Sequence, residues 1–281
     1  MSEKLDRIEA EAEAERVLKD HLFPNLPICP FVIAEKAGII VQPKETSERG
    51  VSGFLMRVGD TFGIQYAKHI ASDGFIRFTV AHELGHYFLP GHADHLFPTG
   101  QGIHHSRSGF ISGDRYERQA DHFASALLMP ASRFRKELDS AGQGFSAIER
   151  LANLFKTSLT ATAIRYATHT DDAVAVIMST GSQIDYCFMS DRIRDLRGIT
   201  WIRKREPVPA GTTTAEFNGD PSNIEEARRD EGTCYLDDWF DGAPQVEVNE
   251  DVVGLGTYGK TLTLLFTEED LDDEDEYCDD D

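Results

Sequence analysis

The residues of this chain best suited to chemistry are His82-Glu-Leu-Gly-His86, an HExxH motif. Apolar residues at helical spacing over 75–89 predict a helix at this position. Because the two histidines are four residues apart, both imidazoles lie on one helix face, where they can share a tetrahedral metal ion. Glu83 would stand beside the open coordination position, where it can take a proton from water and pass it to a leaving amine. We therefore predict a hydrolytic metal centre.

A catalytic zinc ion usually has three protein ligands, and two residues compete for the third place. Glu117 and Asp121 lie at i, i+4 on the next predicted helix, so Glu117 could bind the metal while Asp121 accepts the outer ring N–H of a ligand histidine. His92 competes because the motif and His92 reproduce the H-E-x-x-H-x-x-G-x-x-H spacing of metzincins. Leu89 replaces their glycine and resists the sharp turn after the helix, although Pro90-Gly91 could supply a turn instead.

The motif is followed by a second one, and together they closely resemble the ImmA/IrrE family of metallopeptidases. The second motif reads Glu117-x-x-Ala120-Asp121-x-Phe123-Ala124-x-x-Leu127-Leu128-Met129-Pro130. The resemblance covers roughly the first half of the chain, and the remainder is a looser match to longer, IrrE-like members.

This resemblance implies a zinc site made by His82, His86 and Glu117, with Glu83 as the general base of a gluzincin-like endopeptidase. It further implies site-specific cleavage of a helix-turn-helix transcriptional repressor, which would derepress stress-response or mobile-element genes. The competing class is a non-enzymatic regulator that binds DNA or a transcription factor and has a structural metal or none. Glu83 favours the enzyme, because a structural site has no use for a base at that position.

The predicted elements give an α+β fold in four parts. They are a zincin-like domain of helices and a small mixed sheet (1–140), a helix-turn-helix-like segment (141–170), a smaller α/β or mostly β domain (171–267) and a disordered acidic tail (268–281). Strands over 53–58 and 61–66 flank Gly59-Asp60, which predicts a hairpin. Residues 63–66 could form an edge strand that pairs with substrate.

The stretch from 90 to 113 lacks periodicity and predicts a long loop. Three of its histidines could bind metal adventitiously, but they are expected to be exposed residues of the loop. They are His95, His104 and His105.

The net charge of −21 argues against direct binding to DNA, which is held mostly by Lys and Arg. Residues 268–281 contain eleven acids and no base, so the tail carries about half of this charge. The helix pair expected over 145–168 offers only Arg150, Lys156 and Arg165 as bases.

An acidic enzyme could instead be drawn to a basic repressor. Deletion of 268–281 would then slow cleavage more at low salt than at high salt.

Other patterns exclude further classes of protein. Residues 254–261 match the P-loop pattern, but a strand rather than a helix is expected to follow, which argues against nucleotide binding. Residues 1–22 predict a charged helix without the apolar core of a signal peptide, so we expect a cytoplasmic protein without a membrane anchor. The cysteines form no CxxC pair and indicate reduced thiols rather than disulfides. They are Cys29, Cys187, Cys234 and Cys278.

Overall fold

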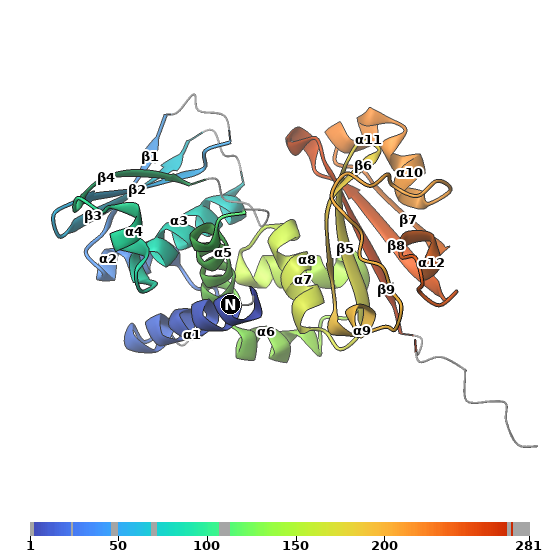
Figure 1. Cartoon of the computed structure of the whole chain (residues 1–281), viewed down its shortest axis with the longest axis horizontal. Helices are drawn as coiled ribbons and strands as arrows, with labels where there is room; N and C mark the ends of the chain where they lie inside the picture. Colours follow the sequence, from blue (N-terminus) through green and yellow to red (C-terminus); the bar gives the residue numbers. More distant parts are fainter. Residues whose placement is uncertain are drawn as a thin grey trace, which may run out of the picture. The chain divides into compact units, whose positions relative to one another are not determined.

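The computed structural model describes residues 3–23, 25–45, 50–68, 72–106, 113–268 and 271. The fold is α+β, as predicted, and contains two sheets flanked by helices (Figure 1). Two compact units make up the chain: Met1–Glu137 with Arg150–Ala161, and Leu138–Glu149 with Thr162–Asp281. The finer division into four parts stays a prediction. Among the described residues, no helix combines the length and apolar character that crossing a membrane requires.

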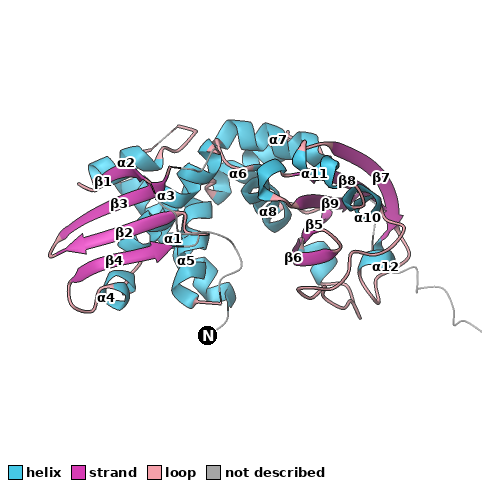
Figure 2. Ribbon diagram, turned by 90° about the horizontal axis from the view of Figure 1, so that it is seen from above, coloured by secondary structure: helices cyan, strands magenta, loops and turns pink. Residues whose placement is uncertain are grey.

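The first unit is built on a mixed four-stranded sheet in the order β1-β3-β2-β4 (Figure 2). β1 and β3 are parallel, and the other pairs are antiparallel. The predicted hairpin is present, and Gly59 in its turn adopts a positive φ of 60°. The strands are β1 (Ile40–Lys44), β2 (Gly53–Val58), β3 (Thr61–Ala67) and β4 (Gln101–Ser106).

The helices of this unit include the two that carry the predicted site. α3 begins after Ser72, whose side chain accepts a hydrogen bond from the Phe75 N–H, and it ends just before Pro90. α5 begins after Asp114, which caps it in the same way, and ends just before Pro130. Helices within this unit are α1 (Glu3–Asp20), α2 (Pro30–Lys36), α3 (Asp73–Phe88), α4 (His92–Leu96) and α5 (Arg115–Leu128), and α6 (Ala131–Leu138) ends one residue beyond it.

α3 and α5 pack closely beneath the sheet (Figure 1). Gly85 makes this approach possible, because a Cβ atom there would lie 3.1 Å from the Cα of Ala120. Phe123 and Leu127 on α5 are fully buried, as is Leu84 on α3. Small residues at the crossing and large ones around it therefore fix the two helices as a rigid pair.

The prediction of a loop over 90–113 was wrong for its described part. This stretch contains α4 and β4, and β4 pairs with β2 at one edge of the sheet. β3 lies between β1 and β2, so the expectation that 63–66 form an edge strand was also wrong. The sequence of β4, Gln-Gly-Ile-His-His-Ser, has no alternating apolar pattern. Its extended conformation comes from pairing with β2, and the local sequence contains no pattern that predicts this pairing.

The second unit contains an antiparallel five-stranded sheet in the order β6-β5-β9-β8-β7. The strands are β5 (Ala173–Thr180), β6 (Gln183–Met189), β7 (Arg229–Tyr235), β8 (Glu247–Gly254) and β9 (Thr261–Thr267). Four short helices accompany them: α9 (Asp191–Arg194), α10 (Thr213–Asn218), α11 (Pro221–Glu225) and α12 (Leu236–Trp239).

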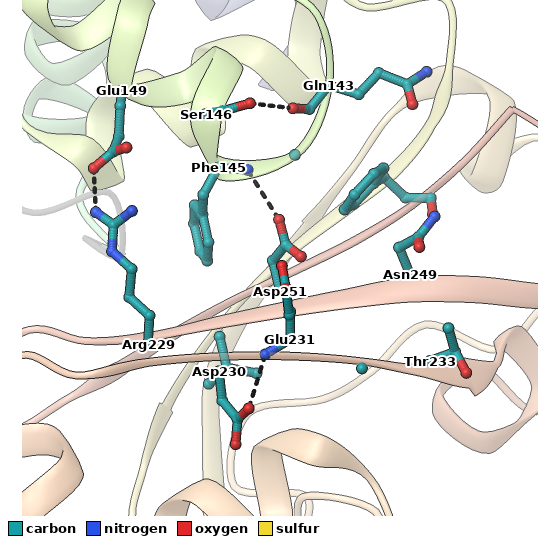
Figure 3. Close-up of a pocket in the computed structure, with 14 residues that line it drawn as sticks. Gln143, Phe145, Ser146, Glu149, Arg229, Asp230, Glu231, Thr233, Asn249 and Asp251 are labelled. Carbon is teal, nitrogen blue, oxygen red and sulfur yellow. Dashed lines mark hydrogen bonds and ion pairs between the residues drawn. The ribbon is translucent and has the colours of Figure 1, made fainter.

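The helix pair expected over 145–168 is present as α7 (Gly144–Phe155) and α8 (Leu159–His169). Within the second unit, the start of α7 borders an open cavity of about 810 Å³ beside β7 and β8 (Figure 3). The Phe145 N–H donates to Asp251 over 3.0 Å, and Glu149 forms an ion pair with Arg229. Arg165 on α8 is buried, so the basic surface of this helix pair is even smaller than its sequence suggests.

The P-loop-like stretch forms a short turn followed by β9, as expected from its sequence. Gly256–Tyr258 form a 3-10 helix, and Gly259 adopts a positive φ of 64°. Lys260 forms an ion pair with Asp185 on β6. The pattern therefore serves as a turn between two antiparallel strands and does not open a helix.

Candidate metal centre

Three potential ligand atoms converge between α3 and α5. The Nε2 atoms of His82 and His86 are 3.1 Å apart. The carboxylate of Glu117 lies 3.4 Å from the first nitrogen and 3.2 Å from the second. Both histidines are fully buried, and the Glu117 side chain is 15% exposed. The structure therefore brings together the two histidines of the motif and the first of the two candidates for a third ligand.

The spacing of these atoms suits a tetrahedral zinc ion. Ligands held about 2.0–2.1 Å from zinc at tetrahedral angles lie about 3.3 Å from one another. The two nitrogens are 3.1 Å apart, and each lies close to that value from one oxygen of Glu117: His86 is 3.2 Å from Oε1 and His82 is 3.4 Å from Oε2. Two imidazole nitrogens and one carboxylate oxygen also form a common donor set for catalytic zinc, which keeps its fourth position for water or substrate. His82, His86 and Glu117 could therefore hold the ion.

Asp121 lies where a residue that orients His82 is needed. Its carboxylate is 2.8 Å from Nδ1 of His82, on the side of the ring away from the ligand cluster. Burial opposes a charge on His82, but hydrogen bonds to Asp121 and Glu117 outweigh it and raise the pKa of His82 to about 10. Burial lowers the pKa of His86 to about 3. Metal binding would therefore displace a proton from His82, whereas His86 is already neutral and can bind the metal without losing a proton.

We expect Asp121→Asn to weaken zinc binding by roughly 10–100-fold, because an amide cannot hold the His82 ring as a carboxylate does. Competition with a chromogenic chelator measures this change. Asp114→Asn is a matched control, because Asp114 lies on the same helix and asparagine can still cap it. Equal zinc retention by Asp121→Asn and the native chain would contradict the orienting role.

The carboxylate of Glu83 is buried close to the ligand cluster. Both of its oxygens are buried and have no hydrogen-bond partner among the described residues. Burial raises the pKa of Glu83 to about 7, although the charge of His82 and the nearby Ser106 hydroxyl partly offset the effect. An acid with a pKa near neutrality can both accept and return a proton, as a general base must.

The position of Glu83 depends on a glycine in the neighbouring strand. A Cβ atom at Gly53 on β2 would collide with Oε1 of Glu83 and lie 2.7 Å from the Thr79 methyl group. The carboxylate therefore occupies space that any other residue at position 53 would fill.

We expect Gly53→Ala to displace the Glu83 side chain and to destabilise the fold by about 1–3 kcal/mol, as overpacking usually does. Urea unfolding measures the stability, and metal content should change less than activity. Gly63→Ala on β3 is the matched control, because its Cβ would lie 3.2 Å from the flexible end of Met56 and at an ordinary contact distance of 3.8 Å from the Ile40 carbonyl oxygen. The same loss in both variants would show that Gly53 has no special relation to Glu83.

His92, the other candidate ligand, contacts His86 from the opposite side. Its Nδ1 is 3.1 Å from Nδ1 of His86, and its Nε2 is 3.2 Å from the side-chain oxygen of Gln119. The Gln119 amide in turn donates to Asp6 on α1 over 3.2 Å. Gly91, with a φ of 80°, provides the turn that brings His92 there. His92 thus supports the outer face of His86 through a hydrogen-bonded chain that ends on the first helix.

Sequence reasoning missed His104. It was expected to be exposed in a loop, but it lies on β4 with 21% of its side chain exposed, and its Nε2 is 2.9 Å from Oε1 of Glu117. Only the pairing of β4 with β2 places it there, so no local signal could have found it. His95 stacks on Tyr116, and His105 meets Phe54 edge-on. Of these three histidines, only His104 contacts a predicted ligand among the described residues.

Comparison with known proteins finds a family domain in this part of the chain. Residues 34–166 match the model of the IrrE N-terminal-like domain. The chain thus carries this domain, and the resemblance to the ImmA/IrrE family is confirmed. A solved structure described as a Mycobacterium tuberculosis transcriptional regulator has a similar fold, with a TM-score of 0.57 and 14% identity. The similarity covers 92% of this chain and 76% of that one. No match is found among the curated proteins.

Proposed function

We propose that this protein is a zinc-dependent endopeptidase that makes a site-specific cut in a helix-turn-helix transcriptional repressor. The observation that carries the proposal is Glu83, a buried carboxylate without a hydrogen-bond partner, next to three converging ligand atoms. Burying a carboxylate without a partner opposes folding, so such a group indicates a functional role. The IrrE N-terminal-like domain supports a metallopeptidase that acts on repressors. Such a substrate implies action in the cytoplasm.

His82, His86 and Glu117 would hold the metal ion, which supplies a Lewis acid and activates water at neutral pH. Glu83 accepts the proton of the attacking water on its carboxylate and returns it to the leaving amine. Asp121 keeps the His82 ring oriented, and His92 supports the ring of His86. The site therefore has distinct residues for binding the metal, moving the proton and holding the ligands in place.

The edge strand β4 gives the substrate a place to bind. Its His104 contacts Glu117, so this strand runs past the ligand cluster. One edge of β4 pairs with β2, and the other is unpaired among the described residues. A substrate in extended form can add to such an edge through its backbone. Cleavage would then need a substrate segment that leaves regular structure, which favours a cut in a linker or loop.

The test is incubation of the zinc-loaded protein with purified helix-turn-helix repressors that are encoded nearby or are co-regulated. Mass spectrometry of the fragments identifies the cleaved bond. We expect one cut in one repressor and no cut with Glu83→Gln. Cleavage by both proteins would point to a contaminating protease. Zinc bound at the site with no cleavage of any repressor, but with tight binding to one, would favour the non-enzymatic regulator.

A further inference from the structure

The second unit contains a basic segment in an otherwise acidic chain. Residues 191–206 hold six basic and three acidic residues, whereas the whole chain has a net charge of −21. The acids are already engaged: Asp191 and Asp195 pair with Arg194, and Glu206 accepts the N–H of Arg203. The six bases are Arg192, Arg194, Arg197, Arg203, Lys204 and Arg205.

Several of these bases have no counter-charge in the part of the chain that the structure describes. Arg197, Lys204 and Arg205 are exposed, and none of them forms an ion pair with any residue that the structure describes. Arg205 adopts a φ of 73°, a strained conformation for a residue other than glycine. Trp201, between the two groups of bases, is 56% exposed. Unpaired cations on both sides of an exposed aromatic residue in the sequence indicate a surface that binds a partner.

The apolar residues of the basic segment belong to the same core cluster as Leu271. Leu271 is 3% exposed and packs in the cluster that contains Ile193. Leu196, Ile199 and Ile202 pack against this cluster as well. The acidic tail therefore starts at the core cluster against which the basic segment packs. The ten residues after Leu271 include eight acids and no base.

We propose that residues 272–281 bind the basic segment 191–206 of the same chain. Ten extended residues span at most about 33–36 Å, enough to follow a segment anchored in the same cluster. A short tether gives an effective concentration in the millimolar range, so weak ion pairs suffice. The tail then neutralises a surface that would otherwise attract phosphate backbones. The sequence alone suggested that the tail draws a basic substrate, but the basic segment is a nearer partner.

Zero-length carbodiimide cross-linking of the full chain tests this contact. Lys204 is the only lysine in the basic segment, so a bond between Lys204 and a carboxylate of 272–281 reports docking. We expect this cross-link at about 0.01 M salt and its severalfold loss at about 1 M, where the Debye length falls to about 3 Å. A triple variant, Arg197→Glu, Arg203→Glu and Arg205→Glu, keeps Lys204 and should lose the cross-link severalfold. Arg135→Glu with Lys136→Glu, on the exposed face of α6, should leave it unchanged.

A second measurement does not depend on the triple variant folding. Removal of 272–281 leaves every described residue in place and should increase acrylamide quenching of Trp201, while Trp239 is only 5% exposed and contributes little. Cross-links from the tail spread evenly over all exposed lysines, or unchanged quenching, would overturn the proposal. Cross-links found only between copies, in a mixture of isotope-labelled and unlabelled chains, would also overturn it. None of these results depends on peptidase activity.

Discussion

Replacing Glu83 by glutamine is expected to lower the cleavage rate by roughly 10²–10⁴-fold, the usual contribution of a positioned general base. Glutamine has nearly the same shape but cannot accept the proton of the attacking water. His82, His86 and Glu117 are unchanged, so zinc content should equal that of the native chain. Because the native carboxylate is buried without a partner, its loss should not lower the thermal unfolding temperature.

The measurement combines metal analysis, thermal unfolding and single-turnover cleavage of the identified repressor. Full activity of Glu83→Gln with normal zinc would exclude Glu83 as the base. Loss of activity together with loss of zinc would mean that Glu83 supports the metal site rather than the proton transfer. Glu137→Gln is a suitable control, because this glutamate lies in the same unit on α6, away from the motif.

Replacing Glu117 by alanine is expected to weaken zinc binding by more than the roughly 10–100-fold that loss of a supporting residue produces. Glu117 contributes one of only three converging ligand atoms, and its carboxylate is held by His104 at 2.9 Å. His92→Ala should show the smaller loss, because His92 contacts the outer nitrogen of His86 and not the cluster. Chelator competition on both variants measures the difference.

The comparison of Glu117→Ala with His92→Ala decides the third ligand. Equal and small losses would show that neither residue binds the metal and that the assignment of the site is wrong. A larger loss for His92→Ala would transfer the ligand role to His92. Glu117→Gln separates the charge from the shape, because an amide oxygen is a weaker ligand of the same size.

The helices of the site could be predicted from sequence, and the strand beside them could not. α3 and α5 carry their own start signals, Ser72 and Asp114, and their own stops, Pro90 and Pro130. Their apolar periodicity and the spacing of the ligands are local properties. β4 has no such pattern, so neither its edge position nor the contact of His104 with Glu117 could be foreseen.

The second unit was harder to predict for the same reason. β7 is mostly exposed and reads Arg-Asp-Glu-Gly-Thr-Cys-Tyr, without alternation. The start of α10 is held by Glu250 on β8, which is fully buried and accepts hydrogen bonds from the N–H groups of Thr213 and Thr214. A glutamate is expected on the surface. Only the folded chain shows that this one caps a helix distant in sequence.

The hydrogen-bonded chain from His86 through His92 and Gln119 to Asp6 has a practical consequence for cloning. A gene fragment trimmed to the family match would begin at residue 34 and omit α1. Such a fragment would retain the whole HExxH motif and Glu117. It would lose Asp6, which also binds Arg115 over 2.8 Å, together with the apolar face that α1 buries at Ala10, Ala14 and Val17. A negative assay on that fragment would reflect its boundaries rather than the chemistry of the site.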